Sequence, residues 1–256
     1  MEKFIVLIGT LDTKAEELEF AKEQIEKRGH KVILLDISVG NKPAKRGDVS
    51  CEELWRLGGG GTDMWSIRDR KKRTKIMTDG AIKKVKELFD NGTLGGIMAI
   101  GGAGGTLMGT DIMKAVPFGV PKFMVSSNAS ARGFPERYFD IADITMMHTV
   151  VDVAGLSDPL RFLITQAAGA ICGMVESTPD REMLFTRDKP AIAICELMIR
   201  AEIIQYLRKL LYQKGYNPTV FMATGIGDRA MEEMIRQGMF DGVIDLSPRG
   251  LLENII

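Results

Sequence analysis

The stretch GGIMAIGGAGGT, residues 95–106, leads from a predicted buried strand into a predicted helix through a turn made mostly of glycine. A continuous apolar run is typical of a strand that helices cover on both faces. Glycine allows the backbone to approach a phosphate closely, and N–H groups at the start of a helix attract anions. The stretch therefore predicts a parallel α/β sheet with an anion-binding turn, although a bare structural turn is the alternative.

The same alternation of strand and helix surrounds this stretch. Near the N-terminus, residues 4–8 and 31–37 are predicted strands, and residues 14–28 between them carry apolar side chains at helical spacing. A further strand is predicted at 121–125 and a long helix at 159–174. Strands joined by helices through short connections form right-handed βαβ units. The predicted fold class is therefore α/β, with a Rossmann-like doubly wound parallel sheet.

A polar segment from 177 to 190 separates two parts of the chain. We expect a nucleotide-binding α/β domain over residues 1–180 and a partial second α/β domain over residues 190–256. The second part holds only three predicted strands, which is half of a doubly wound domain. It is therefore expected to be incomplete: either the chain is a fragment, or this half docks onto another surface.

Composition narrows the expected partners and location. Basic and acidic residues number 34 each, so the formal net charge is zero, and neither nucleic acid nor an anionic membrane is an expected partner. No run approaches the ~18 apolar residues of a membrane span and no signal peptide is recognisable, so we expect a cytoplasmic protein. Cys51, Cys172 and Cys195 lack the spacing of metal ligands and are expected in the core.

The glycine-rich turn is expected to bind phosphate through its backbone. Its N–H groups and the Thr106 hydroxyl are suited to hold about two or three phosphate oxygens without any net protein charge. The pattern is neither a P-loop nor a first-turn dinucleotide fingerprint. The expected contacts here are Gly101, Gly102, Ala103, Gly104, Gly105 and Thr106.

A second cluster of polar side chains follows the first predicted strand. Gly9, Thr10, Asp12, Thr13 and Lys14 lie where that strand gives way to a helix, next to the expected topological switch of the sheet. Helix capping alone explains Asp12 or Thr13, but it does not require the whole cluster. We therefore expect Lys14 to pair with phosphate and Asp12, directly or through water, to help hold a magnesium ion.

Two further strand ends supply weaker candidates. Asp36 ends the second strand, where many nucleotide-binding folds place an acid on ribose hydroxyls. Ser126 and Ser127 follow a later strand and add uncharged donors at the same expected edge, with a simple turn as the alternative.

Two other features favour structural explanations. The basic stretch 68–75 is interpreted as a solvated helix start, with a phosphate or partner patch as the alternative. His148 lies between Asp143 and Asp152, which suggests acid/base chemistry, but a satisfied structural histidine is the favoured interpretation.

With these loops in place, the sequence resembles the ATP-binding domain family named for the tomato mosaic virus resistance protein. The resemblance rests on residues 8–14, 101–106, 119–122 with Ser126 and Ser127, and 151–155, and it spans nearly the whole chain. It implies a pair of α/β domains with ATP held in the first by the glycine turn and the first-strand junction. Departures from the family pattern lie mainly in the second part.

Two functions stay open. The first is an ATP-binding module in which the nucleotide regulates self-association, giving a homo-oligomer, or the binding of a protein partner. The second is an enzyme that uses ATP and magnesium to act on an unknown small substrate. A domain for NAD or a sugar phosphate is a third possibility, and the missing first-turn fingerprint argues against a dinucleotide.

Overall fold

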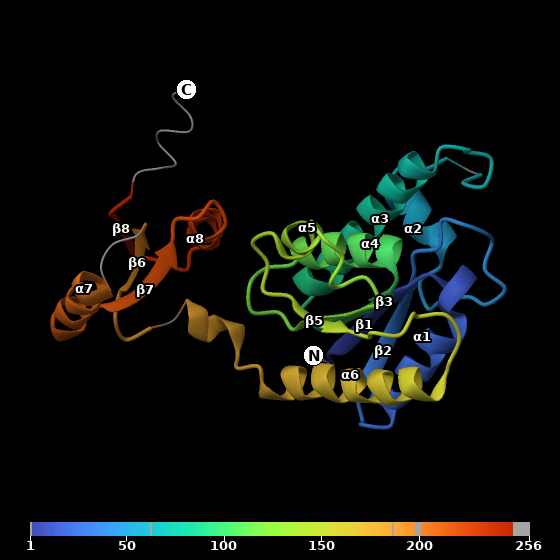
Figure 1. Ribbon diagram of the computed structural model, residues 1–256, viewed down its shortest axis with the longest axis horizontal. Coiled ribbons are helices and arrows are strands. Elements are labelled where there is room, and N and C mark those ends of the chain that lie inside the picture. The colour runs from blue at the N-terminus through green and yellow to red at the C-terminus, as the bar shows by residue number, and fades with distance from the viewer. Residues whose placement is uncertain (1, 62, 186, 198–200, 248–256) are drawn as a thin grey trace. The chain divides into compact units, whose positions relative to one another are not determined.

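The computed structural model describes residues 2–61, 63–185, 187–197 and 201–247. The chain divides into two units, residues 1–178 and 179–256, and each is described here by itself (Figure 1).

The first unit is built on a parallel sheet of five strands. In chain order they are β1 (Phe4–Gly9), β2 (Lys31–Asp36), β3 (Leu94–Gly101), β4 (Lys122–Ser126) and β5 (Thr145–His148). Their order across the sheet is β2-β1-β3-β4-β5, which is one of the common doubly wound orders. The order reverses between β1 and β3, so the ligand-binding edge is expected at their carboxyl ends. The predicted fold class is confirmed.

The register brings several strand ends into one row. Gly9 pairs with Asp36, Gly101 pairs with Ser126, and Ser126 in turn pairs with His148. Residues that the sequence places on different strands therefore meet at the carboxyl edge of one sheet.

Helices cover both faces of this sheet (Figure 1). One face carries α1 (Leu11–Glu26) and α6 (Asp158–Ser177), and the other carries α2 (Cys51–Leu57), α3 (Arg70–Asp90) and α4 (Ala103–Lys114), with the short α5 (Pro135–Phe139) beside α4. Each face has its own buried apolar cluster. This arrangement explains why the strands read as continuous apolar runs.

Helices α2 and α3 touch through their backbones. A Cβ atom on Gly80 would lie 1.8 Å from the Leu54 carbonyl oxygen, and one on Gly58 would lie 1.9 Å from that of Ile76. Only glycine fits at such crossings. The contact fixes the position of α3, whose first turn is capped by Asp69 accepting hydrogen bonds from the N–H groups of Lys71 and Lys72.

The second unit is smaller. Its parallel sheet has the order β7-β6-β8, from β6 (Ala191–Glu196), β7 (Asn217–Met222) and β8 (Gly242–Asp245), with helices α7 (Ala201–Gln213) and α8 (Gly227–Arg236) and a 3-10 turn, η1 (Arg181–Leu184). The last nine residues of the expected second domain, 248–256, lie outside the described residues. The three cysteines are free and buried, as predicted. None of the described helices has the length and apolarity that crossing a membrane requires.

Candidate functional site

A cavity of about 1360 Å³ opens in the first unit between α3 and α4. Five segments line it: the β1–α1 junction, the loop after β2, the first part of α3, the glycine turn with the following α4, and α5 through Arg137. The ends of β1 and β3 thus deliver two of the predicted clusters to one space, at the point where the strand order reverses.

The glycine turn presents unpaired backbone donors to this cavity. Gly102 is the N-cap of α4 and accepts the Thr106 N–H at 2.8 Å, but it has no side chain to cap the helix. Within the described part of the chain, the N–H groups of Ala103, Gly104 and Gly105 have no hydrogen-bond acceptor. N–H groups without an acceptor and the helix dipole both favour negative charge at such a helix start, so the predicted anion-binding role of the turn stays a prediction that this geometry suits.

The space around Gly101 and Gly104 differs, and it explains why glycine stands at each position of the turn. A Cβ atom on Gly101 would lie 2.8 Å from the Cα of Gly105, so a side chain at Gly101 would collide with backbone. Gly104 lines the cavity, and a Cβ atom there would meet nothing within 4 Å. Gly101 therefore allows the turn to close, whereas Gly104 leaves room for a ligand.

The β1–α1 junction lines the same cavity but differs in its hydrogen bonding. Helix α1 begins at Leu11 with Thr10 as its N-cap, so the alternative in which Asp12 or Thr13 caps the helix is wrong. The N–H of Leu11 is taken by Asp36 at 3.1 Å and that of Asp12 by Ser38 at 3.0 Å. The start of α1 is therefore already satisfied by the protein, and its contribution to a ligand must come from side chains.

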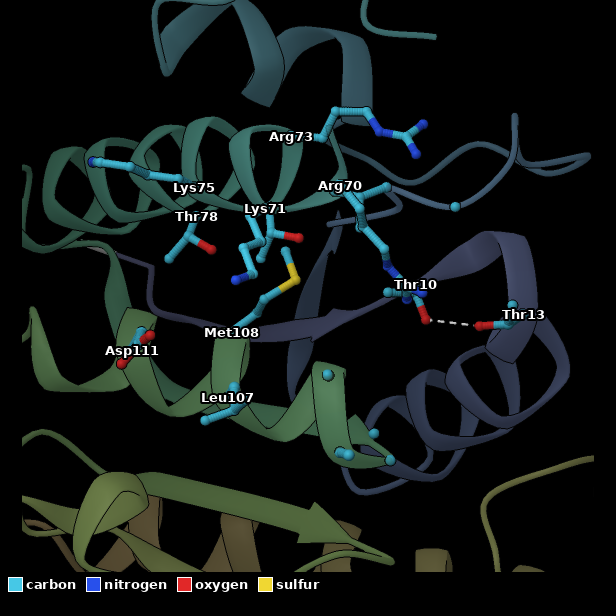
Figure 2. A pocket seen from close by; sticks show the side chains of 18 of the residues that line it. Thr10, Thr13, Arg70, Lys71, Arg73, Lys75, Thr78, Leu107, Met108 and Asp111 are labelled. Atoms are coloured by element: carbon cyan, nitrogen blue, oxygen red, sulfur yellow. Dashed lines mark hydrogen bonds between the residues drawn. The ribbon is translucent and has the colours of Figure 1, made fainter. Parts of the chain in front are cut away.

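Four junction residues line the cavity, namely Thr10, Asp12, Thr13 and Lys14. The hydroxyls of Thr10 and Thr13 lie 2.9 Å apart (Figure 2). Lys14, also in the lining, occupies a kink in α1 with φ −134° and ψ 24°, and among the described residues it has no carboxylate partner. Gly9 is buried at the end of β1 and stays outside the lining. Thr10, Thr13 and Lys14 are thus placed to meet a ligand.

Asp12 holds a neighbouring loop. Its Oδ2 accepts hydrogen bonds from the N–H groups of Gly40 at 3.1 Å and Asn41 at 2.9 Å. One carboxylate oxygen is therefore committed to the loop after β2, which also lines the cavity. A metal ion would have to use the other oxygen, and the magnesium role of Asp12 stays a prediction.

Asp36 lies beneath the site, outside the cavity lining. Its side chain is buried, and Oδ1 accepts hydrogen bonds from Leu11 N–H at 3.1 Å, Ser38 N–H at 3.0 Å and the Ser38 hydroxyl. Its Oδ2 has no hydrogen-bond partner in the described residues. Burial raises the pKa of Asp36, and this effect is larger than the lowering effect of the hydrogen bonds that the carboxylate accepts. The geometry favours fixing of the β1–α1 junction over the expected contact with a ribose.

Thr106, Ser126 and Ser127 support the glycine turn from behind. Thr106 and Ser126 are fully buried, and their hydroxyl oxygens lie 2.7 Å apart. The Thr106 hydroxyl also donates to the Gly102 carbonyl at 2.8 Å, while Ser127 donates to Asp152 at 2.9 Å. None of the three lines the cavity. The direct phosphate contact expected of the Thr106 hydroxyl does not fit this burial, because its single proton is donated to the Gly102 carbonyl inside the protein.

The basic start of α3 is the part of the site that sequence reasoning set aside. Arg70, Lys71, Arg73 and Lys75 line the cavity across from the glycine turn. Figure 2 shows Arg70 extending toward Thr10 and Lys71 toward Met108, while Arg73 extends away from the cavity. Lys75 is paired with Asp79 at 2.7 Å.

Charge in the cavity is therefore predominantly positive. Six cationic and three acidic residues line the cavity, so positive charges outnumber negative ones. Within the described chain, three of the cations, Lys14, Arg70 and Lys71, form no ion pair with a carboxylate. These side chains are exposed or half-buried, so the interpretation as a solvated helix start holds as well. The patch is positive locally although the whole chain is neutral.

The other end of the cavity is apolar and closes on an ion pair. Ile82, Leu107 and Met108 provide apolar surface. Beyond them Asp111 receives both guanidinium nitrogens of Arg137, at 2.6 and 2.7 Å. Burial works to raise the pKa of Asp111, but hydrogen bonds from Arg137 and Lys114 outweigh it and hold the pKa below its ordinary value. The cavity thus combines an excess of cations with apolar side chains from α3 and α4.

His148 belongs to a separate group at the ends of β4 and β5. It is exposed, and each of its ring nitrogens lies within hydrogen-bond distance of a polar neighbour, as the favoured interpretation of a satisfied structural histidine expects. Its Nε2 lies 3.3 Å from the Ser130 hydroxyl and its Nδ1 lies 3.4 Å from the Ser126 carbonyl oxygen. Two residues later, Val150 is 82% exposed with φ at 62°, a strained backbone for a β-branched residue.

Comparison with known proteins places the whole chain. A model described as the uncharacterised protein family (UPF0261) N-terminal domain matches residues 3–180, and the model of its C-terminal domain matches residues 189–256. A UPF0261 protein of Clostridium tetani is 34% identical over 100% of this chain and 62% of its own length. The ToMV resistance protein Tm-1 of Solanum lycopersicum is 28% identical over 98% of this chain and 36% of its own length. The chain thus spans less than two thirds of these relatives.

Among solved structures, a UDP-GlcNAc 2-epimerase from Neisseria meningitidis bound to UDP-GlcNAc is similar with a TM-score of 0.34 at 8% identity, over 96% of this chain and 73% of the other. A structural similarity this low does not indicate a shared function. The sequence relatives confirm the expected resemblance at the level of the family, and ATP binding stays a prediction.

Proposed function

We propose that this chain, which belongs to the uncharacterised protein family UPF0261, is a nucleotide-binding protein that holds ATP in the cavity between α3 and α4. The observation that carries the proposal is the first turn of α4: among the described residues, the N–H groups of Ala103, Gly104 and Gly105 have no acceptor, and these residues line a cavity that also holds cations without an ion-pair partner. In the proposed complex, backbone donors and cationic side chains bind the phosphates from two sides.

The phosphates are assigned to the glycine-turn end of the cavity. Arg70 extends toward Thr10 at this end, Lys14 lines the cavity from the β1–α1 junction, and Lys71 extends from α3 toward Met108 in the middle of the cavity. Each is a charge-assisted donor. A chain with several negative charges suits this end better than a neutral ligand, because unpaired cations gain most from a polyanion. ATP fits that requirement, and a magnesium ion would offset part of its charge, with Asp12 as the nearest expected ligand.

The nucleoside is assigned to the remaining space. Leu107, Met108 and Ile82 offer apolar surface for a planar base, and ligand sites generally combine such surface with a few polar groups. A dinucleotide is less suitable, because the tight first-turn fingerprint is absent and the start of α1 is already satisfied by Asp36 and Ser38.

Coupling to association is part of the proposal. Two solvent-facing segments line the cavity, the start of α3 and the loop at Gly40 and Asn41. A bound nucleotide would therefore order surface that a second copy or another protein can contact. The self-associated state is expected to increase with ATP, as measured by analytical ultracentrifugation with and without the nucleotide. An unchanged mass distribution at saturating ATP would contradict the coupling between ATP binding and self-association, but it would not contradict ATP binding itself.

The binding itself is tested by calorimetric titration of the purified chain. ATP, ADP, NAD and ribose phosphate are compared in the presence of magnesium. We expect ATP to bind in the micromolar range and more tightly than the other three. A preference for NAD, or the absence of nucleotide binding, would overturn the proposal.

An enzyme is the second candidate, and the group around His148 favours it. A histidine whose Nδ1 faces the Ser126 carbonyl is expected to carry its proton there, which leaves Nε2 as an acceptor toward Ser130. Ser127 approaches the glycine turn, since a Cβ atom on Gly102 would lie 3.7 Å from its hydroxyl oxygen. If the protein turns ATP over, a His148→Gln variant should lose ADP formation and keep its ATP affinity. Equal turnover in both proteins would remove this candidate.

A further inference from the structure

The pair Asp111–Arg137 lies at the end of the cavity opposite the β1–α1 junction. Figure 2 shows Asp111 on one side, Thr10 and Thr13 on the other, and Leu107 and Met108 between them. Along α4, Asp111 is eight residues beyond Ala103, a distance of about 12 Å at the rise of an α-helix. A ligand whose phosphates lie at the glycine turn would therefore place its far end near this ion pair.

Asp111 and Arg137 keep hydrogen-bonding positions that their own ion pair does not use. Asp111 Oδ1 receives Arg137 at 2.6 Å and Lys114 at 2.7 Å, whereas Oδ2 receives only Arg137, at 2.7 Å, among the described residues. A carboxylate oxygen accepts about two hydrogen bonds, so Oδ2 keeps one free position. The guanidinium has five N–H donors and spends two on Asp111 in this fork. One acceptor and further donors therefore stand side by side at this end.

The position of the pair is well supported. Lys114 donates to the Arg137 carbonyl oxygen at 3.0 Å as well as pairing with Asp111, so α4 and α5 are tied at this point. Asp111 itself is largely covered, with 28% of its side chain exposed. A planar fork held by two helices gives a fixed direction to its remaining hydrogen-bonding positions.

We propose that Asp111, oriented by Arg137, selects nucleotides whose base carries an amino group at this end over those that carry a carbonyl oxygen. The inference rests on the proposed nucleotide site and concerns its specificity. A 6-aminopurine presents an N–H donor next to the N7 acceptor, which matches the free Oδ2 and the guanidinium donors. At that same edge a 6-oxopurine presents two acceptors, N7 and O6, so its oxygen would face the carboxylate without a hydrogen bond and with repulsion.

The test compares ATP with inosine triphosphate, which differs in having oxygen in place of the amino group. Both are titrated by calorimetry into the wild-type chain and the Asp111→Asn variant. We expect the wild type to bind ATP at least about tenfold more tightly than inosine triphosphate, the range of one good base-edge contact. In Asp111→Asn the ratio should fall to within about threefold, because the amide can also donate to a carbonyl oxygen.

Asp79→Asn is the matched control. Asp79 lines the same cavity and is paired with Lys75, but its substitution should change the affinity for both nucleotides by the same factor. Arg137→Gln is a second variant, in which the loss of the fork should also lower the ratio, and thermal denaturation verifies that each variant is folded.

The outcomes separate the two claims. If the wild type binds neither nucleotide, the proposed function fails and the inference fails with it. If both are bound but with equal affinity, or with a ratio that Asp111→Asn and Arg137→Gln leave unchanged, nucleotide binding stands and the selective role of Asp111 is overturned.

Discussion

Gly101 and Gly105 approach so closely that a methyl group on Gly101 would stand 2.8 Å from the Cα atom of Gly105 and 2.9 Å from its carbonyl carbon. The end of β3 therefore rests directly on the first turn of α4. The buried contact between the Thr106 and Ser126 hydroxyls, 2.7 Å long, ties the same turn to β4. Together these contacts fix the start of α4, and with it the N–H groups of Ala103, Gly104 and Gly105, at the edge of the cavity.

Gly101→Ala should destabilise the fold. The added methyl group meets backbone atoms that cannot move independently, so we expect a loss of about 1–3 kcal/mol in the free energy of unfolding. Gly104→Ala is the control, because its Cβ atom meets nothing within 4 Å; there we expect no loss, or a gain of up to about 1 kcal/mol from helix propensity. Urea denaturation measures both, and equal stability of the two variants would contradict the packing account.

Lys71→Ala should weaken nucleotide binding by about tenfold. Lys71 extends into the cavity with no ion-pair partner in the described chain, and a charge-assisted hydrogen bond contributes about 1.5–3 kcal/mol. Lys72→Ala removes the same charge from the next position, which is exposed and outside the lining, and should leave the affinity within about twofold. Equal losses in a fluorescence-based binding assay would point to the net charge of the helix rather than to the site.

The double variant Asp12→Ala with Lys14→Ala should lose most of its affinity for ATP in magnesium. Lys14 supplies a cation, and Asp12 both holds the loop at Gly40 and Asn41 and is the expected magnesium ligand. Lys22→Ala, on the same helix but paired with Asp48 outside the lining, is the control and should bind as the wild type does. Full affinity in the double variant would defeat the role assigned to this junction.

Asp36→Asn should alter the pH dependence of stability. Burial raises the pKa of Asp36 in the folded protein above the ordinary 3.8, so the folded state binds the proton more tightly than the unfolded state does. Its stabilising contribution is therefore complete below about pH 4 and is lost as the pH rises through the folded pKa. An asparagine keeps the Oδ1 acceptor for Leu11 and Ser38 without this loss.

The corresponding measurement is urea unfolding of both proteins between pH 4 and 8. The stability of Asp36→Asn relative to the wild type should rise with pH. Asp111→Asn is the control, because a lowered pKa gives a contribution that is present above the ordinary value and changes little above about pH 5. A relative stability of Asp36→Asn that falls with pH would show that the carboxyl group titrates in the opposite direction.

Local sequence patterns were sufficient for the sheet and for half of the site. Apolar runs ending in glycine or polar residues predicted the strands around Gly9 and Gly101, because a strand covered on both faces has few alternatives. Parallel pairing then brings their carboxyl ends together, so the glycine turn and the residues from Thr10 to Lys14 share one cavity. The pattern of apolar residues and the rule that parallel strands align their carboxyl ends therefore predict the sheet and these two parts of the site without any tertiary information.

The remaining half depends on packing that no local pattern encodes. Arg70 and Lys71 enter the site because Gly58 and Gly80 allow α2 and α3 to touch, and each glycine is at least nine residues away from either cation along the chain. Burial also changes the role of some polar residues. Asp36, Thr106 and Ser126 lie at the predicted carboxyl edge of the sheet, but their side chains form hydrogen bonds with other groups of the protein. A strand-end position predicts nearness to a site, and only the hydrogen-bond partners decide whether a side chain faces the ligand.

The most direct measurement of the central claim is calorimetric titration of ATP into Gly104→Val beside the wild type and Gly173→Val. Both glycines have open space around them, so both variants should fold, but only Gly104 lines the cavity. The account predicts micromolar binding by the wild type and by Gly173→Val, and its loss in Gly104→Val, where the side chain fills the space of the phosphates. Undiminished binding by a folded Gly104→Val would contradict the assignment of the glycine turn as the nucleotide site.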